Sequence, residues 1–179
     1  MYQKSKLHQD IRDAVLVCME TTDIKDIRVQ TLLRMTGISK ATFYRNYRSV
    51  ESIVKEMEAE FVSGLRDINS KFIGSRLQNP ILLQQNSEAI TRYLDQHRRF
   101  LQIINGPHGD PQFDYKHSRV LMEQLISAAA PQVSLHPYYL RFLIDGTNSV
   151  LNSWLSDPAP LPPEKMAVIL TDMFRRVLL

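Results

Sequence analysis

Residues 40–47 place basic, hydroxyl, amide and aromatic side chains on one short predicted helix. Lys40 and Arg45 can both donate hydrogen bonds to the acceptor atoms of guanine, and Ala41 offers a methyl group that can contact thymine. Hydroxyl and amide side chains suit hydrogen bonds to phosphate oxygens. This stretch supplies them at Ser39, Thr42, Tyr44 and Asn46. These residue types at this spacing predict contact with double-stranded DNA.

The residues before this helix predict the elements that position it. Apolar residues recur at helical spacing and predict a short helix with one buried face: Val29, Leu32 and Leu33. Gly37 supplies the backbone freedom of a sharp turn, and Ser39 can cap the next helix. Phe43 is expected to be its buried residue. A helix, a glycine-containing turn and a basic helix are typical of a helix-turn-helix.

The charge distribution agrees with this interpretation. Residues 1–50 carry nine Lys and Arg against five Asp and Glu, a net charge of +4, whereas the rest of the chain is net −1. Positive charge therefore gathers where DNA contact is predicted. Arg28, Gln30 and Arg48 flank the two helices, and we expect them to assist in contacting the phosphate backbone.

The run TGISKATFYRNYRSVESIV resembles the DNA-binding signature of the TetR family of bacterial transcriptional regulators. The resemblance is specific over about residues 7–53 and weaker beyond them. Three positions depart from the family pattern. Arg28 stands where a Ser or Thr usually caps the second helix, Ala41 replaces a common Gly, and Val50 replaces a Lys that usually meets the phosphate backbone.

The remaining chain predicts an all-α fold, because no segment alternates apolar and polar residues with a period of two. A first helix over 7–21 packs across the helix-turn-helix, and residues 1–6 form a short basic tail. A long helix, capped by Ser49 and reaching about residue 73, connects this head to a helical body. Turn-forming residues in the body separate helices over these ranges: 81–96, 98–104, 111–129, 138–155 and 162–179. We therefore expect a DNA-binding domain over 1–50 and an effector-binding and dimerisation domain over 51–179.

Other chemistry has little support in the sequence. The His residues lack metal-ligand spacing, and the grouping of Asp110 and Asp114 near two histidines fits a solvated helix start better than a metal site. No phosphate-binding glycine motif and no nucleophile with a nearby base is present, so neither a cofactor nor an enzymatic activity is expected. A single Cys18, an amino end without a signal-peptide pattern and no long apolar run predict a cytoplasmic protein.

Two further expectations concern the body. The resemblance implies a homodimer formed by the last two helices, through these residues: Leu143, Val150, Leu151, Trp154, Met166, Leu170 and Phe174. The alternative is that they belong to the core of one chain. A small-molecule effector would occupy an apolar pocket lined by Tyr93, Phe113, Met122, Leu125 and Phe142, although the same residues would also make an ordinary core.

The resemblance further implies a repressor that an effector releases from a palindromic operator. The alternative is control by a protein partner. The chain is short for the family, and its turn over 105–111 resembles that of a subgroup that includes co-activators.

Overall fold

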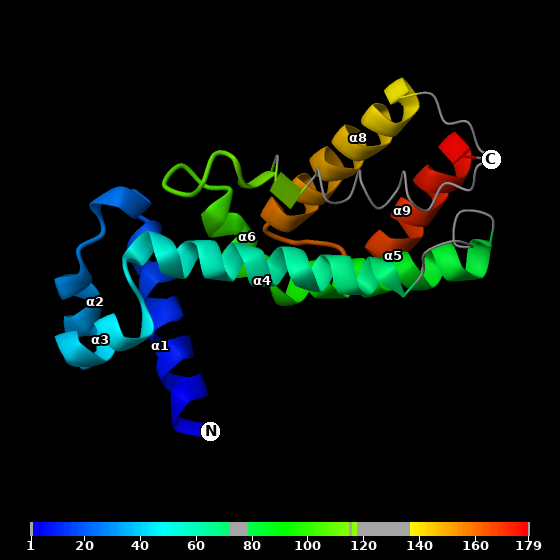
Figure 1. Ribbon diagram of the computed structural model, residues 1–179. Coiled ribbons are helices and arrows are strands. Elements are labelled where there is room, and N and C mark those ends of the chain that lie inside the picture. Colours follow the sequence, from blue (N-terminus) through cyan, green and yellow to red (C-terminus); the bar gives the residue numbers. More distant parts are fainter. Residues whose placement is uncertain (1, 72–78, 115, 118–136, 179) are drawn as a thin grey trace. The chain divides into compact units, whose positions relative to one another are not determined.

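The computed structural model describes residues 2–71, 79–114, 116–117 and 137–178. These ranges form helices and contain no strand, as the sequence predicts (Figure 1). The elements are α1 (Tyr2–Met19), the 3-10 helix η1 (Ile24–Asp26), α2 (Val29–Thr36), α3 (Lys40–Asn46), α4 (Val50–Ser70), α5 (Pro80–Gln96), α6 (Arg98–Ile104), α8 (Pro137–Ser156) and α9 (Pro163–Leu178). No helix of the described ranges has the length and apolar character needed to cross a membrane.

The chain divides into two compact units. The first, here called the head unit, comprises Met1–Phe61 and Gln102–Phe113. The second, the body unit, comprises Val62–Leu101 and Asp114–Leu179. This division falls within α4 rather than before it, and it adds a segment from the middle of the chain to the head unit. The domain boundary expected at residue 50 stays a prediction.

The head unit is built around the inner face of α1. Its apolar core combines residues from α1, α2, α3, the first turns of α4 and the short connections between these helices: Ile11, Ala14, Val15, Leu16, Met19, Ile27, Leu32, Phe43, Tyr47, Val50, Ile53 and Val54. The helix begins at Tyr2, so the short amino-terminal tail expected over residues 1–6 is wrong for residues 2–6. Helix α1 therefore begins five residues before Leu7, where the sequence predicted its start.

The start of α4 follows its sequence signal. Ser49 Oγ accepts a hydrogen bond from the Ser52 backbone N–H at 3.2 Å, and Ser52 Oγ accepts one from the Ser49 N–H at 3.1 Å. This reciprocal cap satisfies two N–H groups that a helix start leaves unpaired. Hydrogen bonding from Ser49 and from its own backbone N–H lowers the pKa of Glu51 below its ordinary value. The carboxylate therefore stays ionised at the positive end of the helix dipole.

In the body unit, α5 packs most extensively on α9. Small and hydroxyl-bearing residues are buried on the two helices, and the hydroxyls donate to carbonyls of their own helix: Ser87, Thr91, Ala167 and Thr171. Because these hydroxyls have partners, their burial leaves no unpaired polar group.

The carboxyl end of α8 is held by Arg98. Its guanidinium donates to the carbonyls of Trp154 and Leu155 at 3.0 and 2.7 Å and lies 4.7 Å from the centre of the Trp154 ring. A cation that pairs with the last carbonyls of a helix also complements the negative end of its dipole. The turn between α8 and α9 is fixed further by Trp154 Nε1, which donates to the Leu161 carbonyl at 2.7 Å.

The turn over residues 105–111, which belongs to the head unit, is closed by backbone hydrogen bonds. The N–H of Asp110 reaches the Ile104 carbonyl at 3.0 Å, and that of Gly109 reaches the Gly106 carbonyl at 3.1 Å. A Cβ atom at Gly109 would lie 1.9 Å from the Ile104 carbonyl oxygen. Only glycine lets the two backbone segments approach this closely.

Gly109→Ala is expected to destabilise the head unit by about 2 kcal/mol or more, because the added methyl group meets a backbone oxygen that cannot rotate away. Thermal and urea unfolding measure the loss. Gly37→Ala provides a graded comparison, since that site has open space and pays about 1–2 kcal/mol only for its left-handed backbone. Parent-like stability of Gly109→Ala would contradict the close approach.

Candidate nucleic-acid interface

The candidate interface is formed by α2, a tight turn and α3. Gly37 ends α2 with a left-handed φ of 70°, and its N–H donates to the Leu33 carbonyl at 2.9 Å. A left-handed residue at this position satisfies a carbonyl at the helix end and reverses the chain direction. The turn that Gly37 predicts from sequence is therefore present, and it sets α3 directly after α2.

The start of α3 is capped as expected. Ser39 Oγ accepts from the Thr42 backbone N–H at 3.1 Å and lies 2.9 Å from Thr42 Oγ1. Arg28, at the corresponding position before α2, makes no side-chain cap. One helix of the pair thus has a side-chain partner for its first N–H groups, and the other does not.

The predicted DNA-contacting residues fall into two groups. Most are exposed: Arg28, Gln30, Ser39, Lys40, Ala41, Tyr44, Arg45 and Arg48. Thr42 and Asn46 are half-buried, and Asn46 Nδ2 donates to the Thr42 carbonyl at 2.7 Å. This amide is therefore already engaged with the helix backbone. The structure brings these residues together on α2, α3 and the segment after α3, and their contact with DNA stays a prediction.

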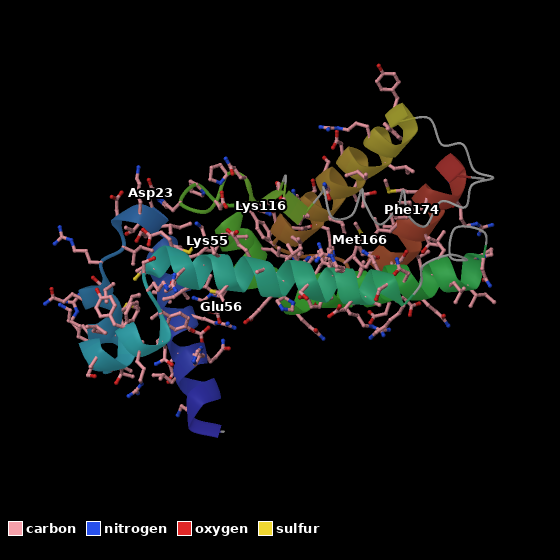
Figure 2. The ribbon with its side chains drawn as sticks, viewed as in Figure 1. Asp23, Lys55, Glu56, Lys116, Met166 and Phe174 are labelled. Carbon is pink, nitrogen blue, oxygen red and sulfur yellow. The ribbon has the colours of Figure 1, made fainter. Side chains whose placement is uncertain are left out.

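The end of α3 is joined to α1 and α4 by a polar cluster. The Tyr47 hydroxyl and His8 Nδ1 are 2.6 Å apart. Arg12, one turn further along α1, donates to Glu56 at 2.8 Å and to both oxygens of Glu60 at 2.6 and 2.7 Å (Glu56 is labelled in Figure 2).

This polar cluster was not among the features predicted from the sequence. A signal existed, because His8 and Arg12 on one helix, and Glu56 and Glu60 on another, are each four residues apart. Spacing alone does not show that two such pairs meet.

A cavity of about 440 Å³ also lies in the head unit, between η1, the start of α4 and the 105–111 turn. Its lining combines charged and apolar residues: Asp23, Ile24, Lys25, Glu51, Val54, Lys55, Glu58, Pro107, Gly109, Asp110 and Pro111. His108 Nδ1 lies 2.7 Å from Asp23 Oδ1 and lowers the pKa of that carboxyl group. Among the described residues, no group of three or more His, Cys, Asp or Glu side chains is placed to hold a metal ion.

The predicted effector residues do not form one described pocket. Phe113 is fully buried in the head unit, where its ring centre lies 5.7 Å from that of Phe61. Tyr93 is half-buried in the body unit beside Gly64. Phe142 on α8 is 66 % exposed, and its place in an effector pocket stays a prediction. Met122 and Leu125 lie outside the described residues.

The predicted interface residues lie on α8 and α9, and most of them are buried within one chain. Leu143, Leu151, Trp154, Met166 and Leu170 are buried within one chain, with 2–7 % exposure, and Val150 and Phe174 are half-buried. Their burial agrees with the alternative that they belong to the core of one chain, and their place in a dimer interface stays a prediction. The outward faces of the same helices carry exposed apolar side chains instead, namely Tyr138, Phe142, Val168 and Ile169.

Comparison with known proteins identifies the chain's family. Residues 83–176, about half of the chain, match the profile of a family described as a transcriptional regulator C-terminal region of the TetR type. The chain belongs to the TetR family of transcriptional regulators. The matched region covers α5, α6, α8 and α9, whereas the TetR resemblance in the sequence lies in the head. Two separate parts of the chain thus point to one family.

Solved structures support the fold. The dihydroxyacetone kinase operon activator DhaS is 16 % identical and has a TM-score of 0.65, with 96 % of each chain covered. A TetR transcriptional regulator from Streptococcus agalactiae 2603V is 17 % identical and has a TM-score of 0.56, with 97 % of this chain and 96 % of that chain covered. At these identities the likeness shows the fold alone. No curated protein matches the chain.

The unequal caps of the two short helices generate a prediction. Arg28→Ser should raise the free energy of unfolding by about 0.5–1 kcal/mol, because a hydroxyl can accept from the open N–H groups of α2. Ser39→Ala should lower it by about 1 kcal/mol, because Thr42 N–H loses its partner. Urea unfolding of both variants measures the opposite shifts. A loss of stability in Arg28→Ser would contradict the uncapped state of α2.

Proposed function

We propose that this TetR-family chain is a homodimeric, sequence-specific DNA-binding regulator in which α2, the turn at Gly37 and α3 act as a helix-turn-helix. The observation that supports this most is the exposed face of α3, where Lys40, Ala41, Tyr44 and Arg45 lie outward over a fully buried Phe43. The Tyr44 ring packs edge to face on Phe43, with centres 5.3 Å apart, and Lys40 and Arg45 add two exposed cations to the same face. A major groove accepts such a helix and offers it acceptors and methyl groups.

In this proposal, Lys40 and Arg45 contact base edges, and Ala41 contacts a thymine methyl group. Ser39, Thr42 and Tyr44 hold the phosphate backbone, assisted by Arg28, Gln30 and Arg48. Asn46 contributes less than its residue type suggests, because its amide already pairs with the Thr42 carbonyl. Two heads of a dimer would contact successive major grooves about 34 Å apart on a palindromic operator.

The dimer is proposed to form through the outward faces of α8 and α9. Phe142, Gly146, Ser149 and Ser153 follow one another at spacings of four, three and four residues, so they share one helix face. A Cβ atom at Gly146 would meet no atom within 4 Å, which leaves this face open to a neighbouring helix. Small residues allow helices to approach closely, and Val168 and Ile169 of α9 add exposed apolar area. A monomer would leave these side chains in water.

Two modes of regulation fit this architecture. In the first, the protein is a repressor that a small-molecule effector releases from DNA, as the family resemblance implies. In the second, it is an activator controlled by a protein partner. One observation favours the activator part of the second mode, namely that the structurally similar DhaS is described as an operon activator. A thermal-shift screen of the purified dimer with metabolites, followed by DNA-binding assays with any stabiliser, separates them, because a ligand that releases DNA must stabilise one state more than the other.

For the DNA contact, Arg45→Ala should weaken binding to a selected operator by about 1–3 kcal/mol and relax preference at one base position. Thr42→Ala should weaken selected and random duplexes alike, because a phosphate contact carries no sequence information. Selection from random duplexes followed by fluorescence anisotropy measures both effects. The exposed Lys71→Ala, which removes the same charge from the end of α4, is the control. An unchanged base preference in Arg45→Ala would refute its base-contacting role.

For the dimer, Ile169→Glu and Phe142→Glu should each give a monomer at micromolar concentration, because a buried charge would lack a partner at the interface. Sedimentation velocity measures the mass, and circular dichroism checks that the helices remain folded. Ile81→Glu, at a 69 % exposed apolar residue of α5, is the matched control and should remain dimeric. A monomeric parent protein would refute the dimer itself, whereas dimeric Ile169→Glu and Phe142→Glu variants would move the interface elsewhere.

A further inference from the structure

The carboxyl end of α3 is held by a polar cluster of the head unit, here called the α1–α3–α4 clamp and formed by His8, Arg12, Tyr47, Glu56 and Glu60. Tyr47 is the C-cap residue directly after α3, and only 4 % of it is exposed. Its hydroxyl meets His8 Nδ1 at 2.6 Å, and the two rings pack edge to face with centres 5.2 Å apart. The end of the proposed recognition helix is therefore tied to α1 by a hydrogen bond and by ring packing.

Arg12 connects the same part of α1 to α4. Its guanidinium is forked between two carboxylates, with both Glu60 oxygens at 2.6 and 2.7 Å and a Glu56 oxygen at 2.8 Å. Hydrogen bonding to Glu60 raises the pKa of Arg12 further above its ordinary value. The Arg12 side chain is 18 % exposed, whereas those of Glu56 and Glu60 are 42 % and 56 % exposed. The pair is thus partly desolvated on the arginine side, where a charge-assisted bond is stronger than on an open surface.

Arg12 also acts on Tyr47. Burial raises the pKa of the Tyr47 phenol above its ordinary value, the Glu56 charge acts in the same direction, and the nearby Arg12 charge acts in the opposite direction. The contacts therefore tie the end of α3 to α1 through Tyr47 and His8, and they tie α1 to α4 through Arg12, one turn further along the same helix. The guanidinium fork fixes the geometry of α1 against α4, because Arg12 meets both carboxylates in one arrangement, while Arg12 Nε and His8 Nε2 are buried without a hydrogen-bond partner among the described residues.

We propose that Arg12 and Tyr47 are positioning residues of the DNA-binding face, and that they make the orientation of α3 follow α4. The inference rests on the proposed function of α3. Neither residue needs to touch DNA. Phe43 anchors the middle of α3 in the core, and the clamp fixes its end, so that two points define the direction of the helix. Without the clamp, α3 keeps its anchor but can turn about it.

The test uses the full-length dimer and a duplex selected by the parent protein from random sequences. Binding of the selected duplex and of a scrambled duplex is measured at a temperature at which circular dichroism shows each variant folded. Arg12→Gln is expected to bind the selected duplex about tenfold more weakly and the scrambled duplex almost as the parent does. Its slope of log affinity against log salt should stay parent-like, because no phosphate contact is lost. Tyr47→Phe should change affinity in the same direction by a smaller factor.

Two further variants separate positioning from simple destabilisation. Arg12→Glu should lose selectivity, and adding Glu60→Arg to it should restore much of that selectivity, because the reversed pair can form again. If Arg12→Gln does not fold, Arg12→Lys keeps the charge, loses the forked geometry and gives the same comparison. Arg92→Gln is the matched control, because Arg92 forms exposed ion pairs with Glu88 and Glu164 in the body unit.

The outcomes are distinct. A lower melting temperature with parent-like affinities in the folded Arg12→Gln variant would overturn the positioning role, and so would a failure of Glu60→Arg to rescue Arg12→Glu. A reduced salt slope would show that Arg12 contacts phosphate directly, which also overturns it. A parent protein that binds selected and scrambled duplexes equally would refute the proposed DNA recognition itself.

Discussion

The complete burial of Phe43 is the constraint on which the rest of the candidate interface depends. In a helix of 3.6 residues per turn, one buried position decides which neighbours lie outward. With Phe43 inward, Lys40, Ala41, Tyr44 and Arg45 are exposed together. The short α3 has no other fully buried side chain, so its orientation depends on this anchor and on the fixed ends that Ser39 and Tyr47 provide.

Local signals predicted the elements of the fold well. Ser39 and Ser49 cap the helices that they were expected to cap, Gly37 adopts the left-handed turn, and Arg28 leaves α2 without a side-chain cap. Each of these outcomes depends on groups within about four residues, whose geometry sequence spacing determines. The all-helical fold and the family followed from the same kind of pattern, together with the residues that carry the TetR signature.

The sequence could not show which apolar helix faces of the body unit pack within the chain and which are exposed. Helix α8 is apolar on two sides: Leu143 and Leu151 are buried within the chain, whereas Phe142 is exposed. Hydrophobicity does not distinguish a residue that packs within its own chain from one that awaits a partner. The α1–α3–α4 clamp could not be predicted for a related reason, since Arg12 lies 44 and 48 residues from its two carboxylate partners. Spacing along one helix indicates a face but not the helix that covers it.

Two of the departures from the family signature, at Val50 and at Arg28, have different structural consequences. Val50 is 2 % exposed and belongs to the head core, so the phosphate contact of the usual lysine has no equivalent at this position. The exposed Arg48, two residues earlier, retains a cation in the same segment. Arg28 loses a helix cap but places a second exposed cation before α2. Both arginines lie outside α3, where charge strengthens binding to any sequence. In the proposed function, the base preference comes from the few outward residues of α3, which is why the orientation of that one short helix matters so much.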